Sequence, residues 1–264
     1  AGGQGCGQEL FSREGVMNVP KVLRVGAVCL IVLVLAVARS VSAQSGDPNA
    51  GKAAYQQLCV ECHGTSGKGD GRVAFGMFPK PRNLTTGLFK IRSTLTLPTD
   101  QDLFQTISQG IPGTAMPSWA NLSEATRRDL VAFVKTLSPE FQQAGETVAQ
   151  ALPATPSQMP ELRSLGKFFA QGKQLFQDAG CVKCHGATGR GDGPKAKTLK
   201  DDWGYRTIPP QPFSIARLKR GRSVEDIHEI LFNGMGGTPM PSFTDSLSDE
   251  EIWEVAFYVW TIAR

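Results

Sequence analysis

A five-residue pattern, Cys-x-x-Cys-His, occurs twice in this 264-residue chain and constrains its fold more than any other feature. The first copy runs from Cys59 to His63, and the second runs from Cys181 to His185. The two thiols of a copy are three positions apart, so a helical turn presents both on one face, with the imidazole directly after them. Each copy therefore predicts a short helical segment that brings two sulfur atoms and one imidazole close together.

This pattern is typical of the covalent attachment of a c-type haem, in which each thiol adds to a porphyrin vinyl group and the His ligates the iron. The predicted thioether residues are Cys59, Cys62, Cys181 and Cys184, and the predicted proximal ligands are His63 and His185. A thioredoxin-like redox pair would not need the following His, and a zinc site would need further ligands nearby. Only three His are present, and two of them belong to these motifs, so we expect two covalently bound haem c groups.

Two methionines are candidates for the second axial ligand. Met116 lies in Gly-Thr-Ala-Met-Pro-Ser-Trp and follows His63 by 53 residues, whereas Met240 lies in Gly-Thr-Pro-Met-Pro-Ser-Phe and follows His185 by 55. A methionine can simply fill a gap in a core, but Met-Pro in two matching loops at matching distances is hard to explain by packing. We therefore expect Met116 and Met240 to be the distal iron ligands.

These motifs resemble those of the class I cytochromes c, and the resemblance covers about residues 46–138 and 166–264. It implies two tandem all-α domains, in each of which a helix bearing the Cys-x-x-Cys-His motif crosses a C-terminal helix. Ser123 and Ser248, each followed by acidic residues, predict the start of that last helix. Apolar stripes at helical spacing follow in both copies, and we expect them to form ordinary core: Leu130, Phe133, Val134 and Leu137, then Val255, Tyr258, Val259 and Ile262.

The segments after the two motifs are also copies of each other. His63 to Gly71 repeats as His185 to Gly193, with glycines that allow a tight loop and with one base and one acid in each copy. Proline-rich segments follow at residues 79–82 and 209–212. The resemblance implies that a prolyl carbonyl in each loop accepts the N–H of the proximal His and thereby fixes its tautomer.

The first 43 residues are expected to be an upstream extension and an export signal. Val25 to Ala38 is an apolar run of 14 residues, which is short for a membrane span, and Val41-Ser42-Ala43 offers small residues for cleavage. We expect Met17 to be the start and cleavage to follow Ala43, so that Cys6 and Cys29 are removed and no disulfide remains. The alternative is an uncleaved anchor that holds the protein on the membrane, facing the periplasm.

The remaining composition fits an exported redox protein. The formal charge is +4 overall and falls to about +2 without residues 1–43, which argues against nucleic acid as a partner. Residues 139–165 are rich in Ala, Gln and Pro and predict a linker between the domains. His228, the third His, falls on a predicted helix from Val224 to Phe232, where a surface or packing role is expected rather than ligation.

The pattern leaves three classes of function. A periplasmic dihaem electron carrier or electron-transfer subunit, rather than an enzyme, is favoured because His and Met would saturate both irons. Its expected partners are a dehydrogenase, a molybdenum oxidoreductase or a terminal oxidase. A dihaem peroxidase-like enzyme is the alternative, and it would need one open iron position. A haem sensor would need a signalling domain, of which the sequence gives no sign.

Overall fold

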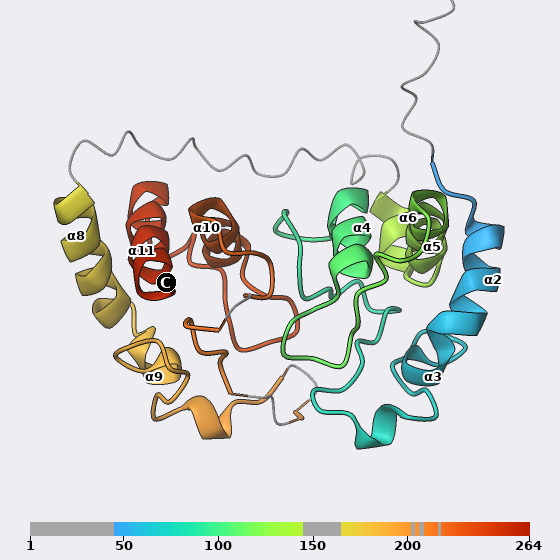
Figure 1. The fold of residues 1–264 in the computed structure, drawn as a ribbon, viewed down its shortest axis with the longest axis horizontal. Coiled ribbons are helices and arrows are strands. Elements are labelled where there is room, and N and C mark those ends of the chain that lie inside the picture. Colours follow the sequence, from blue (N-terminus) through green and yellow to red (C-terminus); the bar gives the residue numbers. More distant parts are fainter. Residues whose placement is uncertain (1–44, 145–164, 202–203, 206–208, 216–217) are drawn as a thin grey trace, which may run out of the picture. The chain divides into compact units, whose positions relative to one another are not determined.

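The computed structural model describes residues 45–144, 165–201, 204–205, 209–215 and 218–264 (Figure 1). In its first half the elements are α2 (Pro48–Leu58), α3 (Val60–His63), η1 (Ala74–Gly76), α4 (Asp100–Gln109), α5 (Glu124–Thr136) and α6 (Pro139–Ala144). In its second half they are α8 (Leu165–Asp178), α9 (Val182–His185), η2 (Ala196–Thr198), α10 (Val224–Asn233) and α11 (Asp249–Ile262). The described part contains no β-strand, so the all-α prediction is confirmed.

Each half is built on the crossing of two helices, α2 with α5 and α8 with α11 (Figure 1). The crossings are close because a glycine lies at each contact. A Cβ atom on Gly51 would lie 1.9 Å from the carbonyl oxygen of Asp129, and one on Gly172 would lie 2.0 Å from that of Glu254. No side chain larger than hydrogen fits at either position, so both crossings depend on glycine.

Side-chain caps begin the helices that the sequence predicted. Ser123 accepts a hydrogen bond from the backbone N–H of Thr126, and Ser248 accepts one from that of Glu251, as expected for helix N-caps. Two further helices start with reciprocal capping boxes, Thr99 with Asp102 at α4 and Ser223 with Asp226 at α10. These bonds satisfy backbone donors that the first helical turn leaves without intrahelical partners.

Two apolar cores lie behind the helix crossings, one in each half. The predicted stripes of α5 and α11 contribute to them, with Leu130, Val134, Val255 and Val259 all buried. Phe141 of α6 is also buried in the first core, so packing in the first half continues to residue 144, inside the predicted linker.

The N-terminal apolar run and residues 145–164 of the predicted linker lie outside the described residues. Within the described residues, none of the helices has the length and apolar character that crossing a membrane requires.

Candidate haem-binding sites

The two Cys-x-x-Cys-His motifs form single helical turns, α3 and α9, each closed by a glycine with positive φ, Gly64 at 77° and Gly186 at 76°. The four motif cysteines are free and half-buried. Burial raises the pKa of Cys59 and of Cys181 to about 11, so both stay protonated at neutral pH. A thioredoxin-like redox pair needs a depressed thiol pKa instead. In the described ranges no cluster of three or more His, Cys, Asp or Glu is arranged to hold a metal ion.

His63 is oriented by a backbone carbonyl. Its Nδ1 donates to the carbonyl oxygen of Arg82 at 3.0 Å. A carbonyl can only accept, so Nδ1 carries the proton and the lone pair of Nε2 is free to ligate a metal. The expectation that a prolyl carbonyl accepts this proton is wrong for the first half. Pro81 precedes the acceptor, but its oxygen faces Gly69, where a Cβ atom would lie 2.4 Å away.

His185 lies among aromatic rings. The ring of Phe213 stacks on it with centroids 4.8 Å apart, and the centroid of Phe176 is 6.5 Å away. Its Nδ1 is buried and bonds to no prolyl carbonyl or other acceptor among the described residues. Burial lowers the pKa of His185 to about 4, so the imidazole is neutral and can act as a ligand at neutral pH.

The two methionine loops have the same hydrogen bonds. In the second half, Met235 N donates to Met240 O at 2.9 Å and Met240 N donates to Thr238 Oγ1 at 3.3 Å. In the first half the matching bonds are Ile111 N to Met116 O at 3.1 Å and Met116 N to Thr114 Oγ1 at 3.2 Å. Both loops therefore present their methionine on the same backbone turn.

A cavity of about 820 Å³ brings the second set of candidates together. Its lining includes the four candidates of this half, Cys181, Cys184, His185 and Met240. Apolar side chains form much of the remaining wall, among them Phe176, Leu231, Val255 and Val259. Such a volume is in the range of cofactor pockets, and two thiols, an imidazole and a thioether are a donor set that suits haem c. In the first half, Cys59, Cys62 and His63 share one turn and Met116 lies in the matching loop, and none of these lines this cavity.

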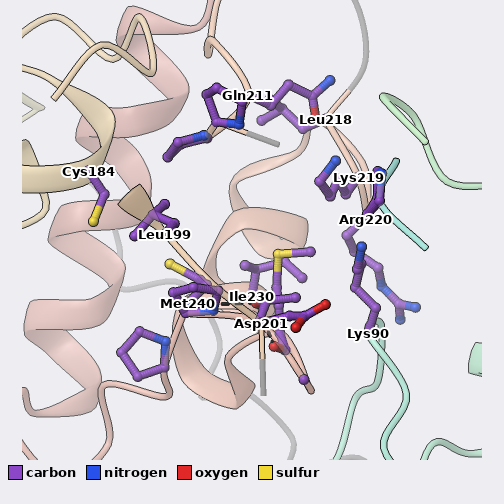
Figure 2. Close-up of a pocket in the computed structure, with 18 of the residues that line it drawn as sticks. Lys90, Cys184, Leu199, Asp201, Gln211, Leu218, Lys219, Arg220, Ile230 and Met240 are labelled. Atoms are coloured by element: carbon purple, nitrogen blue, oxygen red, sulfur yellow. Dashed lines mark hydrogen bonds between the residues drawn. The ribbon is translucent and has the colours of Figure 1, made fainter. Parts of the chain in front are cut away.

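Cationic side chains from both halves line the same cavity. No sequence motif marks them, because they are scattered along the chain. Figure 2 shows Lys90, Lys219 and Arg220 gathered on the side away from Cys184. Burial, followed by the positive charges of Arg82 and Lys219, lowers the pKa of Lys90 to about 7. Lys90 and Lys219 are half-buried, and a negatively charged group would stabilise them; the carboxylates of a bound cofactor are such groups.

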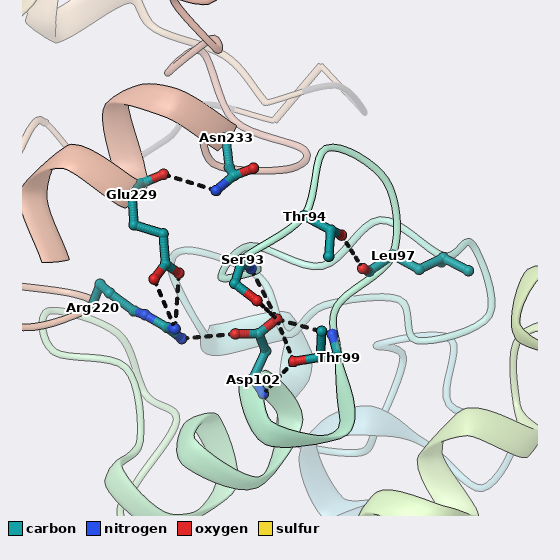
Figure 3. Close-up of polar contacts among 8 residues, drawn as sticks. All are labelled: Ser93, Thr94, Leu97, Thr99, Asp102, Arg220, Glu229 and Asn233. Carbon is teal, nitrogen blue, oxygen red and sulfur yellow. Dashed lines mark hydrogen bonds and ion pairs between the residues drawn. The ribbon is translucent and has the colours of Figure 1, made fainter. Parts of the chain in front are cut away.

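Asp102 and Arg220 join the two halves through a buried ion pair (Figure 3). Asp102 accepts hydrogen bonds from Ser93 and Thr99 and pairs with Nη1 of Arg220 at 3.1 Å. Arg220 also pairs with Glu229 of α10 at 2.8 Å. Asp102 is 1% exposed and Arg220 is 11% exposed, so losing one partner would leave a buried charge without compensation.

His228 has a packing role, one of the two roles expected for it. Its side chain is fully buried, its ring stacks on Trp253 with centroids 4.0 Å apart, and its Nε2 lies 2.8 Å from a carboxylate oxygen of Asp249. Asp249 begins α11, so this contact ties α10 to α11.

Comparison with known protein families gives a match for each half. Residues 169–263 match the family described as cytochrome c, and residues 46–134 match that of cytochrome c oxidase, cbb3-type, subunit III. Cytochrome c-554(547) of Halothiobacillus neapolitanus is 34% identical over 97 residues, which are 35% of this chain and 99% of that protein.

A longer relative matches across half of the chain. The cbb3-type cytochrome c oxidase subunit CcoP of Azospirillum brasilense is 32% identical over 134 residues, which are 50% of this chain. The match spans 41% of that relative, less than half of its length. Among solved structures, a chain of the reducing HAO-like protein complex Kustc0457/Kustc0458 of Kuenenia stuttgartiensis has 37% identity and a TM-score of 0.71. That match covers 84% of this chain and 99% of the other.

Proposed function

Because this chain belongs to the c-type cytochromes, with two cytochrome c domains in tandem and covalently bound haem c, we propose that it is a dihaem electron-transfer protein whose irons are both ligated by His and Met. It acts as a carrier or as an electron-transfer subunit and catalyses no reaction of its own. The two methionine loops are the main support for this proposal. They make the same hydrogen bonds in both halves, and each offers a thioether as a ligand.

In each half, two cysteines, one histidine and one methionine would hold one haem. Cys59 and Cys62 supply the thioether bonds in the first half, with His63 and Met116 as axial ligands. Cys181 and Cys184 do so in the second half, with His185 and Met240 as axial ligands. A bound haem c supplies an iron that accepts and releases one electron.

Side chains around the second cavity would bind and shield that group. Lys90 and Lys219 offset carboxylate charge, which would return the pKa of Lys90 toward its usual range. Phe176, Phe213 and Val259 exclude water from the His185 side. An iron whose two axial positions are both taken by side chains would favour electron transfer over substrate binding.

The expected place of action is the periplasm, where the protein would shuttle electrons between an exported or membrane oxidoreductase and an acceptor. Two similar proteins support this choice of partners: one is named as an oxidase subunit, and the other belongs to an HAO-like complex. A dehydrogenase, a molybdenum oxidoreductase or a terminal oxidase would fit this role. A peroxidase-like enzyme stays the alternative, and it requires one iron that His and Met do not saturate.

Binding of carbon monoxide to the ferrous protein distinguishes an electron carrier from an enzyme. Ferrous protein should bind it slowly and weakly and should turn over peroxide negligibly, because a ligand must first displace Met116 or Met240. Met116→Ala and Met240→Ala should each open one iron and create binding that the parent lacks. Rapid binding by one iron of the parent, with peroxide turnover at enzyme-like rates, would contradict the carrier function.

A further inference from the structure

The loop that carries Met240 is held in part by the opposite half of the protein. Nη2 of Arg82 donates to the carbonyl oxygen of Gly236 at 3.0 Å, four residues before Met240. Gly236 is buried, and a Cβ atom there would lie 2.2 Å from the carbonyl oxygen of Phe89. Main chain of the first half therefore packs directly against this loop.

Arg92 makes a second contact at the same loop. Its Nη2 donates to the carbonyl oxygen of Asn233 at 2.8 Å, and its Nη1 donates to that of Phe89 at 3.3 Å. Asn233 is the last residue of α10, where the helix dipole favours a cation. Arg82 and Arg92 thus fix the backbone at the start of the loop.

The first methionine loop is held in a corresponding way. Nζ of Lys219 donates to the carbonyl oxygen of Pro112 at 2.9 Å. Pro112 follows Gly110, the C-cap of α4, by two residues, and Gly236 follows Gly234, the C-cap of α10, by two residues. Equivalent carbonyls of the two loops thus each accept a hydrogen bond from a cation of the opposite half.

The two cations do not occupy equivalent positions in the repeat. Lys219 precedes the N-cap Ser223 by four residues, and the residue four before the N-cap Thr99 is Leu95. Arg82 precedes Leu84 by two, and the matching loop has Gln211 two before Phe213. The contacts are therefore separate features of the interface between the halves, and repetition of one sequence does not account for them.

We propose that Arg82 is a positioning residue for Met240 and that Lys219 is a positioning residue for Met116, so that each half holds the distal ligand loop of the other. This inference rests on the proposed ligation by the two methionines. A charged donor to a partly buried carbonyl is a strong hydrogen bond, and losing it frees the loop to move. Arg82 also links the two sites, because its own carbonyl orients His63.

Imidazole competition measures how firmly a methionine is held. In a Met116→His background, the thioether-to-iron absorption band of the ferric protein comes from the second haem alone. Adding Arg82→Gln should strengthen imidazole binding to that iron by about tenfold, whereas Arg82→Lys should restore most of the parent behaviour. Arg72→Gln is the matched control, because Arg72 pairs with Glu61 at the surface of the first half, and it should leave the affinity unchanged.

The reciprocal experiment uses Lys219→Gln in a Met240→His background and should weaken the first thioether bond in the same manner. It also keeps the test open if one variant fails to fold. If Arg82→Gln and Arg72→Gln bind imidazole with equal affinity and Lys219→Gln leaves the imidazole affinity unchanged, the positioning role is wrong, although the ligation by methionine stands. If Met116→His and Met240→His together leave a thioether band, the ligation itself is wrong, and the positioning role fails with it.

Discussion

The two halves have the same framework but differ on the side of the proximal histidine. In the first half, Tyr55 donates from its hydroxyl to the carbonyl oxygen of Gly64 at 2.8 Å, and His63 donates to that of Arg82. In the second half, Phe176 takes the place of Tyr55 and has no hydroxyl, and Phe213 stacks on His185. One proximal side is thus polar and hydrogen-bonded, whereas the other is aromatic.

This difference shows that a repeated motif fixes which atoms can ligate a metal but leaves their surroundings to vary. Hydrogen bonding to a ligating His makes the imidazole a stronger donor to the metal, and an apolar shell changes the local polarity. Both changes act on reduction potential, so one framework can hold two electronically different centres.

The largest expected effect tests whether the halves load independently. Cys62→Ala and Cys184→Ala should each remove one covalently bound haem, because the two sites share no ligand. The measurement is the haem content per chain after acid extraction, which should fall from two to one in either variant. Zinc in the purified protein, or haem that extracts freely from the parent, would refute the assignment.

Exchanging a distal ligand should separate the two potentials widely. Met116→His or Met240→His should lower the potential of its own haem by on the order of hundreds of millivolts, since a second His favours ferric iron where a thioether favours ferrous. A redox titration with spectroscopic detection gives both values. The unchanged haem of the same chain is the control, and an unaltered thioether band would show that these methionines are not ligands.

The helix crossings should be equally intolerant of a side chain in both halves. Gly51→Ala and Gly172→Ala should each destabilise the protein by about 1–3 kcal/mol, because the added methyl group meets a backbone carbonyl. Denaturant unfolding checks this. Gly76→Ala and Gly166→Ala are matched controls, since a Cβ atom at either position meets nothing within 4 Å, and they should cost little. A difference between the two crossings would show that the halves are not equivalent in packing.

The smallest effect is the difference between the two proximal sides. The hydrogen bond from His63 to Arg82 should make the potential of the first haem lower than that of the second. A neutral hydrogen bond contributes about 1 kcal/mol, which corresponds to roughly 40 mV for one electron. Single-haem proteins made with Cys62→Ala and Cys184→Ala allow each potential to be assigned. A first haem with the higher potential would show that other features outweigh this hydrogen bond.

Local features were predictable from the sequence because they act over a few residues. Ser123 and Ser248 begin their helices as the Ser and acidic pattern predicted, and the helical turns at Cys59 and Cys181 follow from spacing alone. The haem content and the duplicated domains follow from the same short motifs, since covalent attachment requires these residues at this spacing.

Tertiary structure alone decided which groups surround these motifs. The acceptor for His63 is a main-chain carbonyl, which every residue carries, so no residue type marks Arg82 and the expectation of a prolyl carbonyl was wrong. The pKa of Lys90 is lowered by burial and then by the positive charges of Arg82 and Lys219, which only the fold brings close to it. Arg220 meets Asp102 across more than a hundred residues of sequence, and no periodicity or spacing encodes such a contact. These contacts arise from how the two halves pack, which depends on all of their surfaces at once.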